Sequence, residues 1–422
     1  MTASITQLTD SLFRHESGKV VSLLVKTLGV EHIQLAEDVV QEALARALKT
    51  WPYYGVPENP AAWITQTAKN LALDAVRRDQ VFRRKQVDMF GSVHRWSGKV
   101  GDEDFADFGR EVEDAVLRLM FVCCHPIVPE NSQPVLALKT ICGFGVPEIA
   151  HALFLTDAAV NKRLTRAKEK LNEGEVSADL PVGEKLDERL NGVVKTIYLL
   201  FNEGYKANAG DKLVREDLCA EAIRLCSLLS SMPAGDKPRV HALLALMLFN
   251  SSRLSARMDS EGHILLLKDQ DRSLWDKDMI RRGLVHLSQS AQGDELDTLH
   301  LQAAIAAIHC TAPDFASTDW LRILALYDHM LAIDPSPVIA LNRAVAVGQV
   351  DGPAAGLAAV GQIANRTALE KYAPLHTVLA DFEEQLGNHE IARKHLVRAL
   401  TLTESEREIE FLNSKIESLN NP

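Results

Sequence analysis

Residues 146–171 have the sequence VPEIAHALFLTDAAVNKRLTRAKEKL, which predicts two short helices joined by a tight turn. Thr156 or Asp157 can cap the second helix, because either side-chain oxygen can accept a hydrogen bond from a free N–H group of the first turn. Apolar residues then recur at three- and four-residue spacing, as expected for one buried helix face. They are Val160, Leu164, Ala167 and Leu171.

The opposite face of this second helix is basic and carries an amide. Such a face can neutralise phosphates and pair with base edges in the major groove. The alternative is a charged helix that only faces solvent. The residues that we expect to contact DNA are Asn161, Lys162, Arg163, Thr165, Arg166 and Lys168. The stretch therefore predicts a DNA-reading helix-turn-helix.

The length of 422 residues leaves room for two or three domains of roughly 150 residues each. No apolar run approaches the roughly 20 residues that span a bilayer, and the N-terminus lacks the apolar core of a signal peptide. We therefore expect a cytoplasmic protein without membrane contact. The six cysteines form no CxxC pair, so buried, reduced thiols are expected.

The net charge of −11 is unevenly distributed along the chain. Residues 1–175 carry a net charge of −2 and residues 176–422 carry −9. In the first part, positive charge is concentrated at residues 69–85 and 162–170. Two local basic patches favour contact with DNA at defined places, whereas the acidic C-terminal part is better suited to a protein partner.

Three further helices are predicted at residues 5–29, 35–51 and 61–78 from their helical apolar spacing. Asn59 or Pro60 opens the last of them, and residues 52–60 are expected to form a loop because they contain three prolines and a glycine. Tyr53 and Tyr54 lie in this loop, beside a helix that carries Trp63 and a basic outer face. Exposed aromatic rings next to basic residues can hold unpaired bases.

The two segments AEDVVQEALARALKTWP (36–52) and NPAAWITQTAKNLALDAVRRD (59–79) resemble region 2 of the extracytoplasmic-function (ECF) sigma factors of the sigma-70 family. GVPEIA (145–150) and VNKRLTRAKEKL (160–171) resemble their region 4. Both blocks stand in the order and separation of that family. One departure is apolar Phe154 and Leu155, where the family commonly has polar residues before the recognition helix.

The resemblance implies a sigma factor that binds core RNA polymerase and directs it to promoters. One exposed helix face would dock on the clamp of the largest polymerase subunit; it comprises Glu37, Asp38, Gln41 and Glu42. A second set would melt the −10 element and hold its bases; it comprises Tyr53, Tyr54, Asn59, Trp63, Lys69, Asn70, Arg77 and Arg78. The recognition helix would read the −35 element.

The expected fold is all-α. Region 2 spans 1–85, a flexible linker 86–110, the region 4 helix-turn-helix 111–172, a second linker 173–184, and a C-terminal helical domain 185–422. From about residue 320, helix pairs with turns at Gly348 and Gly387 resemble tetratricopeptide (TPR) repeats. This part resembles the C-terminal extension of a subset of ECF sigma factors. Stacked repeats present a concave surface, so a protein or ligand partner and regulation of the sigma module in cis are expected.

The rival interpretation is a helix-turn-helix regulator or adaptor with a TPR-like interaction domain. The acidic helix followed by an aromatic loop at residues 36–78 argues against it, because an ordinary regulator does not need to dock on polymerase. No nucleotide-binding, hydrolase or metal-ligand motif occurs in the sequence. We therefore expect neither an enzyme nor a cofactor or metal site.

Overall fold

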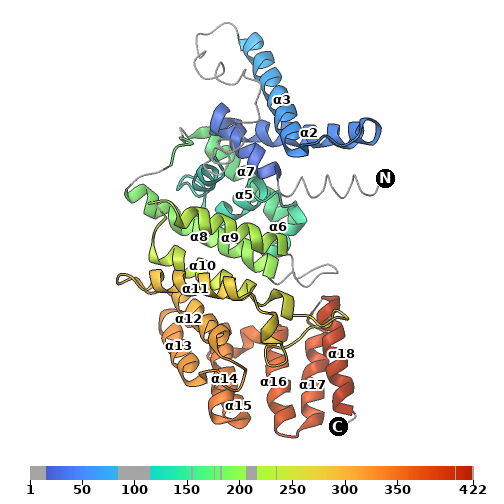
Figure 1. Ribbon diagram of the computed structural model, residues 1–422, viewed down its shortest axis with the longest axis vertical. Coiled ribbons are helices and arrows are strands. Elements are labelled where there is room, and N and C mark those ends of the chain that lie inside the picture. The colour runs from blue at the N-terminus through green and yellow to red at the C-terminus, as the bar shows by residue number, and fades with distance from the viewer. Residues whose placement is uncertain are drawn as a thin grey trace. The chain divides into compact units, whose positions relative to one another are not determined.

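The structure is a computed structural model that describes residues 16–420, except 84–114, 154, 175, 181–182, 206–215, 234 and 404. The predicted linker 86–110 lies outside the described residues. Every regular element in the described part is a helix, which confirms the all-α prediction (Figure 1). Residues 1–199 and 200–422 form two compact units.

Unit 1 opens with a helix at residues 16–28, followed by η1 (Val30–His32), α2 (Ile33–Tyr54) and α3 (Pro60–Arg83). The facing surfaces of α2 and α3 bury Val39, Ala43 and Trp51 on one side and Ile64 and Ala68 on the other. These positions follow helical spacing, so one apolar stripe from each helix makes the contact. Asn59 accepts a hydrogen bond from the Ala62 N–H at 3.0 Å and caps α3, as predicted.

The prediction that a loop begins at Pro52 is wrong. Pro52 lies inside α2, which continues to Tyr54 and ends at Gly55. Proline lacks the N–H that would bond four residues back, but this costs only one bond when it falls in the last turn. Gly55 adopts φ +84° and its N–H donates to the Trp51 carbonyl at 3.0 Å, which terminates the helix.

The rest of unit 1 comprises a helix at 115–123, η4 (Glu130–Ser132), α5 (Gln133–Thr140), α6 (Val146–Ala152) and α7 (Asp157–Glu173). Thr156 accepts a hydrogen bond from the Ala159 N–H at 3.2 Å and so caps α7, as the sequence predicted. The predicted stripe of Val160, Leu164, Ala167 and Leu171 is buried. The two helices of the expected helix-turn-helix are therefore present at residues 146–173.

Helix α8 (Glu184–Tyr205) begins in unit 1 and ends in unit 2. In unit 1, a Cβ atom at Gly192 would lie 2.6 Å from the Gln133 Oε1 atom and 3.1 Å from the Cys124 Cβ atom. Only glycine leaves room for this approach of α8 to the helices beneath α6 and α7. The first half of α8 is therefore part of the packing of unit 1.

Unit 2 is built around α10 (Pro238–Ser251), in which nearly every side chain is buried. Helices α9 (Glu216–Ser230), α11 (Lys277–Ser290) and α12 (Thr298–Thr311) pack against it. Helix α11 was not predicted from the sequence. Residues 263–268, an apolar run in the sequence, are irregular apart from an isolated bridge between Met258 and Ile264.

Six helices complete unit 2: α13 (Trp320–Ile333), α14 (Pro337–Asp351), α15 (Pro353–Gly361), α16 (Ala373–Gln385), α17 (His389–Leu400) and α18 (Glu406–Asn420). Helices α16, α17 and α18 lie side by side, and each helix of the series packs on the next (Figure 1). Gly387 forms the predicted turn, with φ +80°. Gly348 does not, because α14 continues to Asp351 and ends at Gly352, where φ is +90°.

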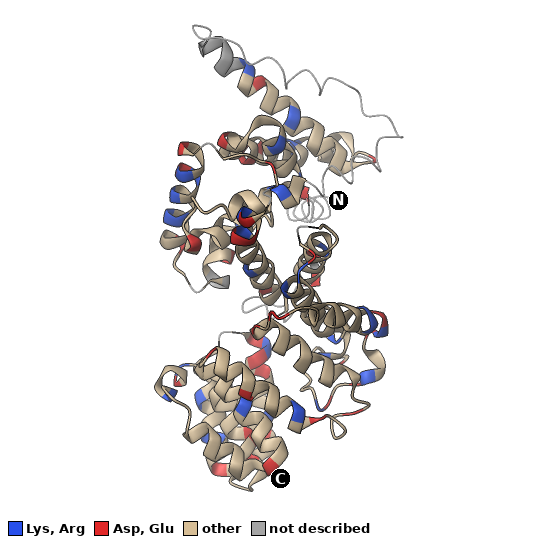
Figure 2. Cartoon of the chain, turned by 90° about the vertical axis from the view of Figure 1, so that its left-hand side faces the viewer, with Lys and Arg blue, Asp and Glu red and all other residues tan. Residues whose placement is uncertain are grey.

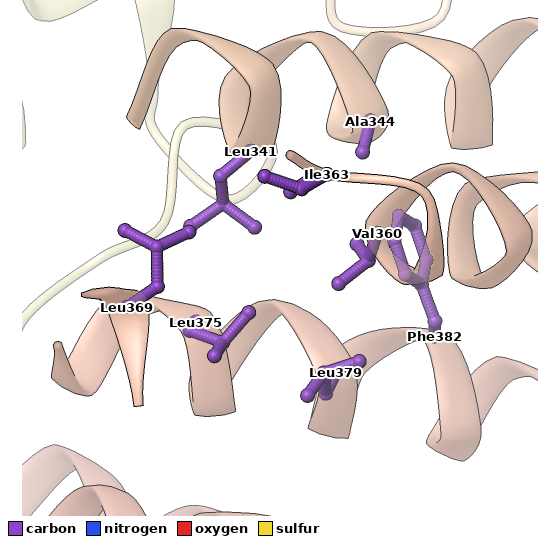
Figure 3. Close-up of a cluster of buried hydrophobic side chains, with 8 residues drawn as sticks. All are labelled: Leu341, Ala344, Val360, Ile363, Leu369, Leu375, Leu379 and Phe382. Atoms are coloured by element: carbon purple, nitrogen blue, oxygen red, sulfur yellow. The ribbon is translucent and has the colours of Figure 1, made fainter. Parts of the chain in front are cut away.

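Gly348 instead makes room for an aromatic ring. A Cβ atom at Gly348 would lie 2.3 Å from the Phe382 ring, and one at Gly356 would lie 2.5 Å from it. Phe382 is thus held between two glycines, one on α14 and one on α15. Its cluster includes Leu341, Val360 and Leu379 from three helices (Figure 3). This buried cluster fixes α14, α15 and α16 against one another.

All six cysteines are free and buried, as predicted. Three lie in unit 1 (Cys123, Cys124 and Cys142) and three in unit 2 (Cys219, Cys226 and Cys310). Burial raises the pKa of the Cys123 thiol to about 12 and raises the pKa values of the Cys124, Cys226 and Cys310 thiols as well. These thiols therefore remain protonated at neutral pH.

Candidate nucleic-acid and polymerase interface

Three of the four residues predicted to dock on polymerase lie together on the surface of α2. Asp38, Gln41 and Glu42 are exposed, and Gln41 and Glu42 lie three and four residues after Asp38, which places both beside it on one helix face. Asp38 accepts a hydrogen bond from Gln34 at 2.8 Å, and Glu42 pairs with Arg46 at 2.9 Å. Exposed pairs of this kind exchange partners at little cost, so the face is available to another protein.

Glu37 departs from the prediction. We expected it to be exposed, but its side chain is 9% exposed and it pairs with Lys168 of α7 at 2.5 Å. Gln34 accepts from the same Lys168 ammonium at 2.7 Å. The second Glu37 oxygen, Oε1, is buried without a hydrogen-bond partner. Lys168 stabilises the ionised Glu37 carboxylate, because a buried charge without a partner would destabilise the fold.

The two tyrosines predicted to hold bases are at the far end of α2. Tyr53 is 84% exposed and Tyr54 is 89% exposed. They lie 11 and 12 residues beyond Glu42, about 16–18 Å along the helix axis at 1.5 Å per residue. Two adjacent exposed aromatic rings form a surface that can contact a partner. One helix thus presents an acidic face and an aromatic tip.

The other residues predicted for the −10 element belong to α3 or cap it. Trp63 is half-buried and packs edge-on against Trp51, with ring centroids 5.6 Å apart, so its main role in the structure is packing. Asn70 is exposed and accepts from Gln66 at 3.0 Å. Lys69 is half-buried and Arg77 is exposed. The Arg78 side chain lies outside the described residues.

Four of the six residues predicted for the −35 element are exposed on α7; they are Asn161, Lys162, Thr165 and Arg166. The other two have partners. Arg163 donates to the Asn131 carbonyl at 3.0 Å and ties α7 to η4, and Lys168 pairs with Glu37. The exposed part of the face predicted to read DNA is therefore narrower than predicted, and it includes Asn161 and Arg166.

Charge is interspersed in both units. Figure 2 shows Lys and Arg alternating with Asp and Glu along the helices, so neither unit is covered by positive charge alone. The positive charge of α7 is local, since Asp157, Glu169 and Glu173 lie on the same helix. An arrangement of this kind suits contact at one defined element rather than general coating of nucleic acid.

Unit 2 contains a cavity of about 720 Å³ between residues 264–268 and helices α13, α14, α16, α17 and α18. Its wall is mainly apolar and aromatic and includes Leu266, Trp320, Tyr327 and Phe411. Two ion pairs lie on it, Lys268 with Asp381 at 4.0 Å and Lys415 with Glu384 at 3.2 Å. An apolar hollow with a few polar groups has the size and character of a ligand or peptide site.

No group of three or more His, Cys, Asp or Glu among the described residues is placed to hold a metal ion. Among the described helices, none combines the length and the apolarity that crossing a bilayer requires.

Two residues at the contacts of α2 with α7 and of the helix at 16–28 with the end of α5 were not predicted from the sequence. Gln34 shares Lys168 with Glu37, and Gly18 in the helix at 16–28 approaches the Ile141 backbone. The signal for Gly18 was its position inside a helical pattern, where a glycine costs stability unless packing requires it. Gln34 carried no such signal.

Comparison with known proteins supports the prediction of region 2 in the N-terminal part of the chain. Residues 12–81 match the sequence family described as Sigma-70 region 2, and residues 189–291 match a family of unknown function, DUF6596. Over 161 residues the chain is 27% identical to the ECF RNA polymerase sigma factor SigW of Bacillus subtilis (strain 168), covering 37% of this chain and 82% of SigW. No solved structure matches the chain.

A second relative extends over both units. The chain is 37% identical over 390 residues to the uncharacterized protein R00370 of Rhizobium meliloti (strain 1021), covering 92% of this chain and 90% of R00370. The chain belongs to the same family as R00370. The match of residues 12–81 to Sigma-70 region 2 supports a relationship to the sigma-70 family.

Proposed function

We propose that the chain is a sigma factor that binds core RNA polymerase in the cytoplasm and directs promoter-specific transcription initiation. The observation that carries this proposal is the surface of α2, where an exposed acidic and amide face and two exposed tyrosines lie within the residues that match region 2. In this role the protein initiates transcription on behalf of polymerase and performs no chemistry of its own.

Three surfaces of the chain have separate roles in this proposal. Asp38, Gln41 and Glu42, joined by Glu37, dock on the clamp of the largest polymerase subunit. Tyr53 and Tyr54 stack on bases released from the −10 element, where base–aromatic stacking contributes about 1–3 kcal/mol per base. The exposed face of α7 reads the −35 element from the major groove, with lysines on phosphates.

The test is run-off transcription with sigma-free core polymerase and fragmented genomic DNA, using the full chain. We expect promoter-specific transcripts that disappear with Asp38→Asn/Glu42→Gln, because the polymerase-docking charge is removed. The matched control is Asp351→Asn, an exposed acid on α14 of unit 2. Absence of both transcripts and core binding from the wild-type chain would refute the sigma assignment and favour the DNA-binding adaptor.

We further propose that unit 2 regulates the sigma module in cis, through TPR-like repeats that take a protein or ligand in the 720 Å³ cavity. A truncation that tests this should end after Tyr205, because the first half of α8 packs within unit 1 and removing residues from 176 onward would expose Cys124 and Gln133. Equal polymerase affinity and equal transcript yield from residues 1–205 and the full chain would refute regulation by unit 2.

A further inference from the structure

The cavity of unit 2 is partly covered by a segment of the chain itself. Residues 257–269, here called the strap, contain no helix. The aliphatic side chains of Ile264, Leu266 and Leu267 line the cavity, and so does Lys268. The three aliphatic side chains are only half-buried. The strap therefore covers an apolar hollow that it does not fill.

The strap is closed by hydrogen bonds within itself. The Leu265 N–H donates to the Arg257 carbonyl at 2.9 Å, and the Asp259 N–H donates to the His263 carbonyl at 3.0 Å. These bonds do not depend on the helices around the cavity. The strap can therefore leave the cavity as one unit without losing its own turn.

The polar hold of the strap on the cavity wall is weak. Lys268 pairs with Asp381 of α16 at 4.0 Å, and the two side chains are 45% and 36% exposed. A pair this long and this exposed contributes little free energy. At the tip of the strap, a Cβ atom at Gly262 would meet the Arg407 guanidinium of α18 only at 3.4 Å. A competing segment can therefore displace the strap at low cost.

The helices around the cavity favour a segment that carries a positive charge. Apart from the strap, the wall has three carboxylates and one ammonium, from Asp381, Glu384, Glu408 and Lys415. Lys415 pairs with Glu384 at 3.2 Å. Burial lowers the pKa of His309 on the same wall to about 4, so this ring adds no charge at neutral pH. Lys268 supplies the second cation, and a segment that replaces the strap must supply one as well.

The polar side chains of α14 favour an extended backbone. Asn342 and Gln349 both line the cavity and lie seven residues apart, about two turns along one helix face. Neither amide forms a hydrogen bond with another residue in the part of the chain that the structure describes. A primary amide offers both a donor and an acceptor, which match the groups of a peptide bond. The wall therefore suits a protein segment better than an apolar small molecule.

We propose that the strap occupies a binding site for a segment of another protein, and that this segment resembles the strap: an extended chain with two or three aliphatic side chains followed by a lysine or arginine. Its aliphatic side chains fill the hollow beside Trp320, Tyr327 and Phe411, and its cation replaces Lys268 beside Asp381. The inference deepens the proposed binding role of unit 2 and rests on it. Because the strap competes for the site, the affinity for the partner is reduced by the fraction of molecules in which the site is open.

The probe is a fluorescein-labelled peptide that copies residues 262–270, GHILLLKDQ, and fluorescence anisotropy measures its binding to the full chain. The wild type should bind weakly, because a tethered strap competes at an effective concentration of about 1 mM. Leu266→Ser/Leu267→Ser removes aliphatic anchors from the strap and should bind at least about tenfold more tightly, as expected when the site is open in at most about a tenth of wild-type molecules. The matched control is Leu321→Ser/Leu386→Ser, which changes two exposed leucines outside the cavity.

Lys268→Ala gives a milder release that keeps every aliphatic contact of the strap. It should tighten binding of the peptide by roughly two- to threefold, in line with an exposed ion pair. This variant tests the inference even if the double serine variant does not fold.

Charge reversal tests the place of the cation. In the Lys268→Ala background, the peptide should bind more tightly than the same peptide carrying K268E. Asp381→Lys should reverse this preference, because the like charges then belong to the unmodified peptide. Asp351→Lys, which changes an exposed acid on α14 outside the cavity, should leave the preference as it was.

A zero-length carbodiimide, which joins a carboxylate and an ammonium in contact, locates the bound peptide. Without peptide, mass spectrometry of the wild type should find the Lys268–Asp381 cross-link. A saturating peptide with an isotope-labelled lysine should replace it by a cross-link between that lysine and Asp381. The pair of Lys170 and Glu173, 2.6 Å apart within α7, is the internal reference and should not change.

Three results would overturn the inference. The first is that neither the wild type nor a folded strap variant binds the peptide, or that a scrambled peptide of the same composition binds equally well. The second is peptide binding that leaves the Lys268–Asp381 cross-link in place. The third is dimerisation of the strap variants in sedimentation, which would make a second copy of the chain the occupant. None of these measurements contains polymerase or DNA, so their failure is distinct from failure of the sigma assignment.

Discussion

The Phe382 ring, held between Gly348 and Gly356, offers a test of the packing that shapes the cavity of unit 2. Gly348→Ala places a methyl group 2.3 Å from the ring, and a closely packed aromatic side chain cannot move aside freely. Overpacking of this kind costs about 1–3 kcal/mol. Replacing a mid-helix glycine by alanine stabilises the helix by roughly 0.5–1 kcal/mol. We therefore expect a net loss of about 1–2 kcal/mol in the free energy of unfolding.

Phe382→Ala removes the ring itself. Phe382 is 2% exposed, and loss of a buried phenylalanine side chain costs about 3–5 kcal/mol. In this background, Gly348→Ala no longer meets the ring. The same substitution should then stabilise α14 by roughly 0.5–1 kcal/mol, so the sign of its effect reverses.

Hydrogen exchange of peptides from residues 337–385 measures the local stability of these helices without requiring unit 1 to unfold. Gly361→Ala is the control, with no atom within 4 Å of its Cβ position and equal effects expected in both backgrounds. If Gly348→Ala costs the same with and without Phe382, to within about 0.5 kcal/mol, the two residues are independent and the described packing is wrong.

Three further predictions concern the DNA surfaces and pH. Asn161→Ala and Arg166→Ala should each weaken promoter binding by about 1–3 kcal/mol, as measured by footprinting, and equal loss on all sequences would exclude base reading. Tyr53→Ala/Tyr54→Ala should leave thermal stability unchanged, because both rings are exposed, and should reduce permanganate reactivity of melted promoters; unchanged melting would refute their role. Burial, with Arg253 and Arg272 nearby, lowers the pKa of His309 from 6.5 to about 4. The unfolded chain binds the proton first, so the free energy of unfolding should fall as pH decreases from about 6.5 toward 4. In urea denaturation His309→Gln should flatten that slope, and an unaltered slope would exclude His309 as its source.

Features set by near neighbours could be predicted from the sequence. Thr156 caps α7, Asn59 caps α3 and Gly387 turns the chain, because each depends on groups within about four residues. The buried stripe of α7 follows from the same local spacing. Gly348 was misassigned as a turn, since the sequence does not distinguish a glycine that breaks a helix from one that admits a ring.

Features set by distant partners could not be predicted. Glu37 lies at the edge of the polar face of α2, beside buried Ile33 and Val40, and its ion-pair partner Lys168 is 131 positions away. Arg163 is likewise drawn to the Asn131 carbonyl, 32 positions away. Helix α11 was not predicted, although Asp276 caps its first turn.

The buried cysteines are divided equally between the two units, so their thiols can report local opening of each unit. A buried thiol with a raised pKa reacts with an alkylating reagent only after its surroundings open, so the labelling rate measures the population of the open form. Three thiols lie in each unit, and peptide mass spectrometry reads them separately. One labelling time course can therefore follow unit 1 and unit 2 independently in the unmodified chain, with and without polymerase.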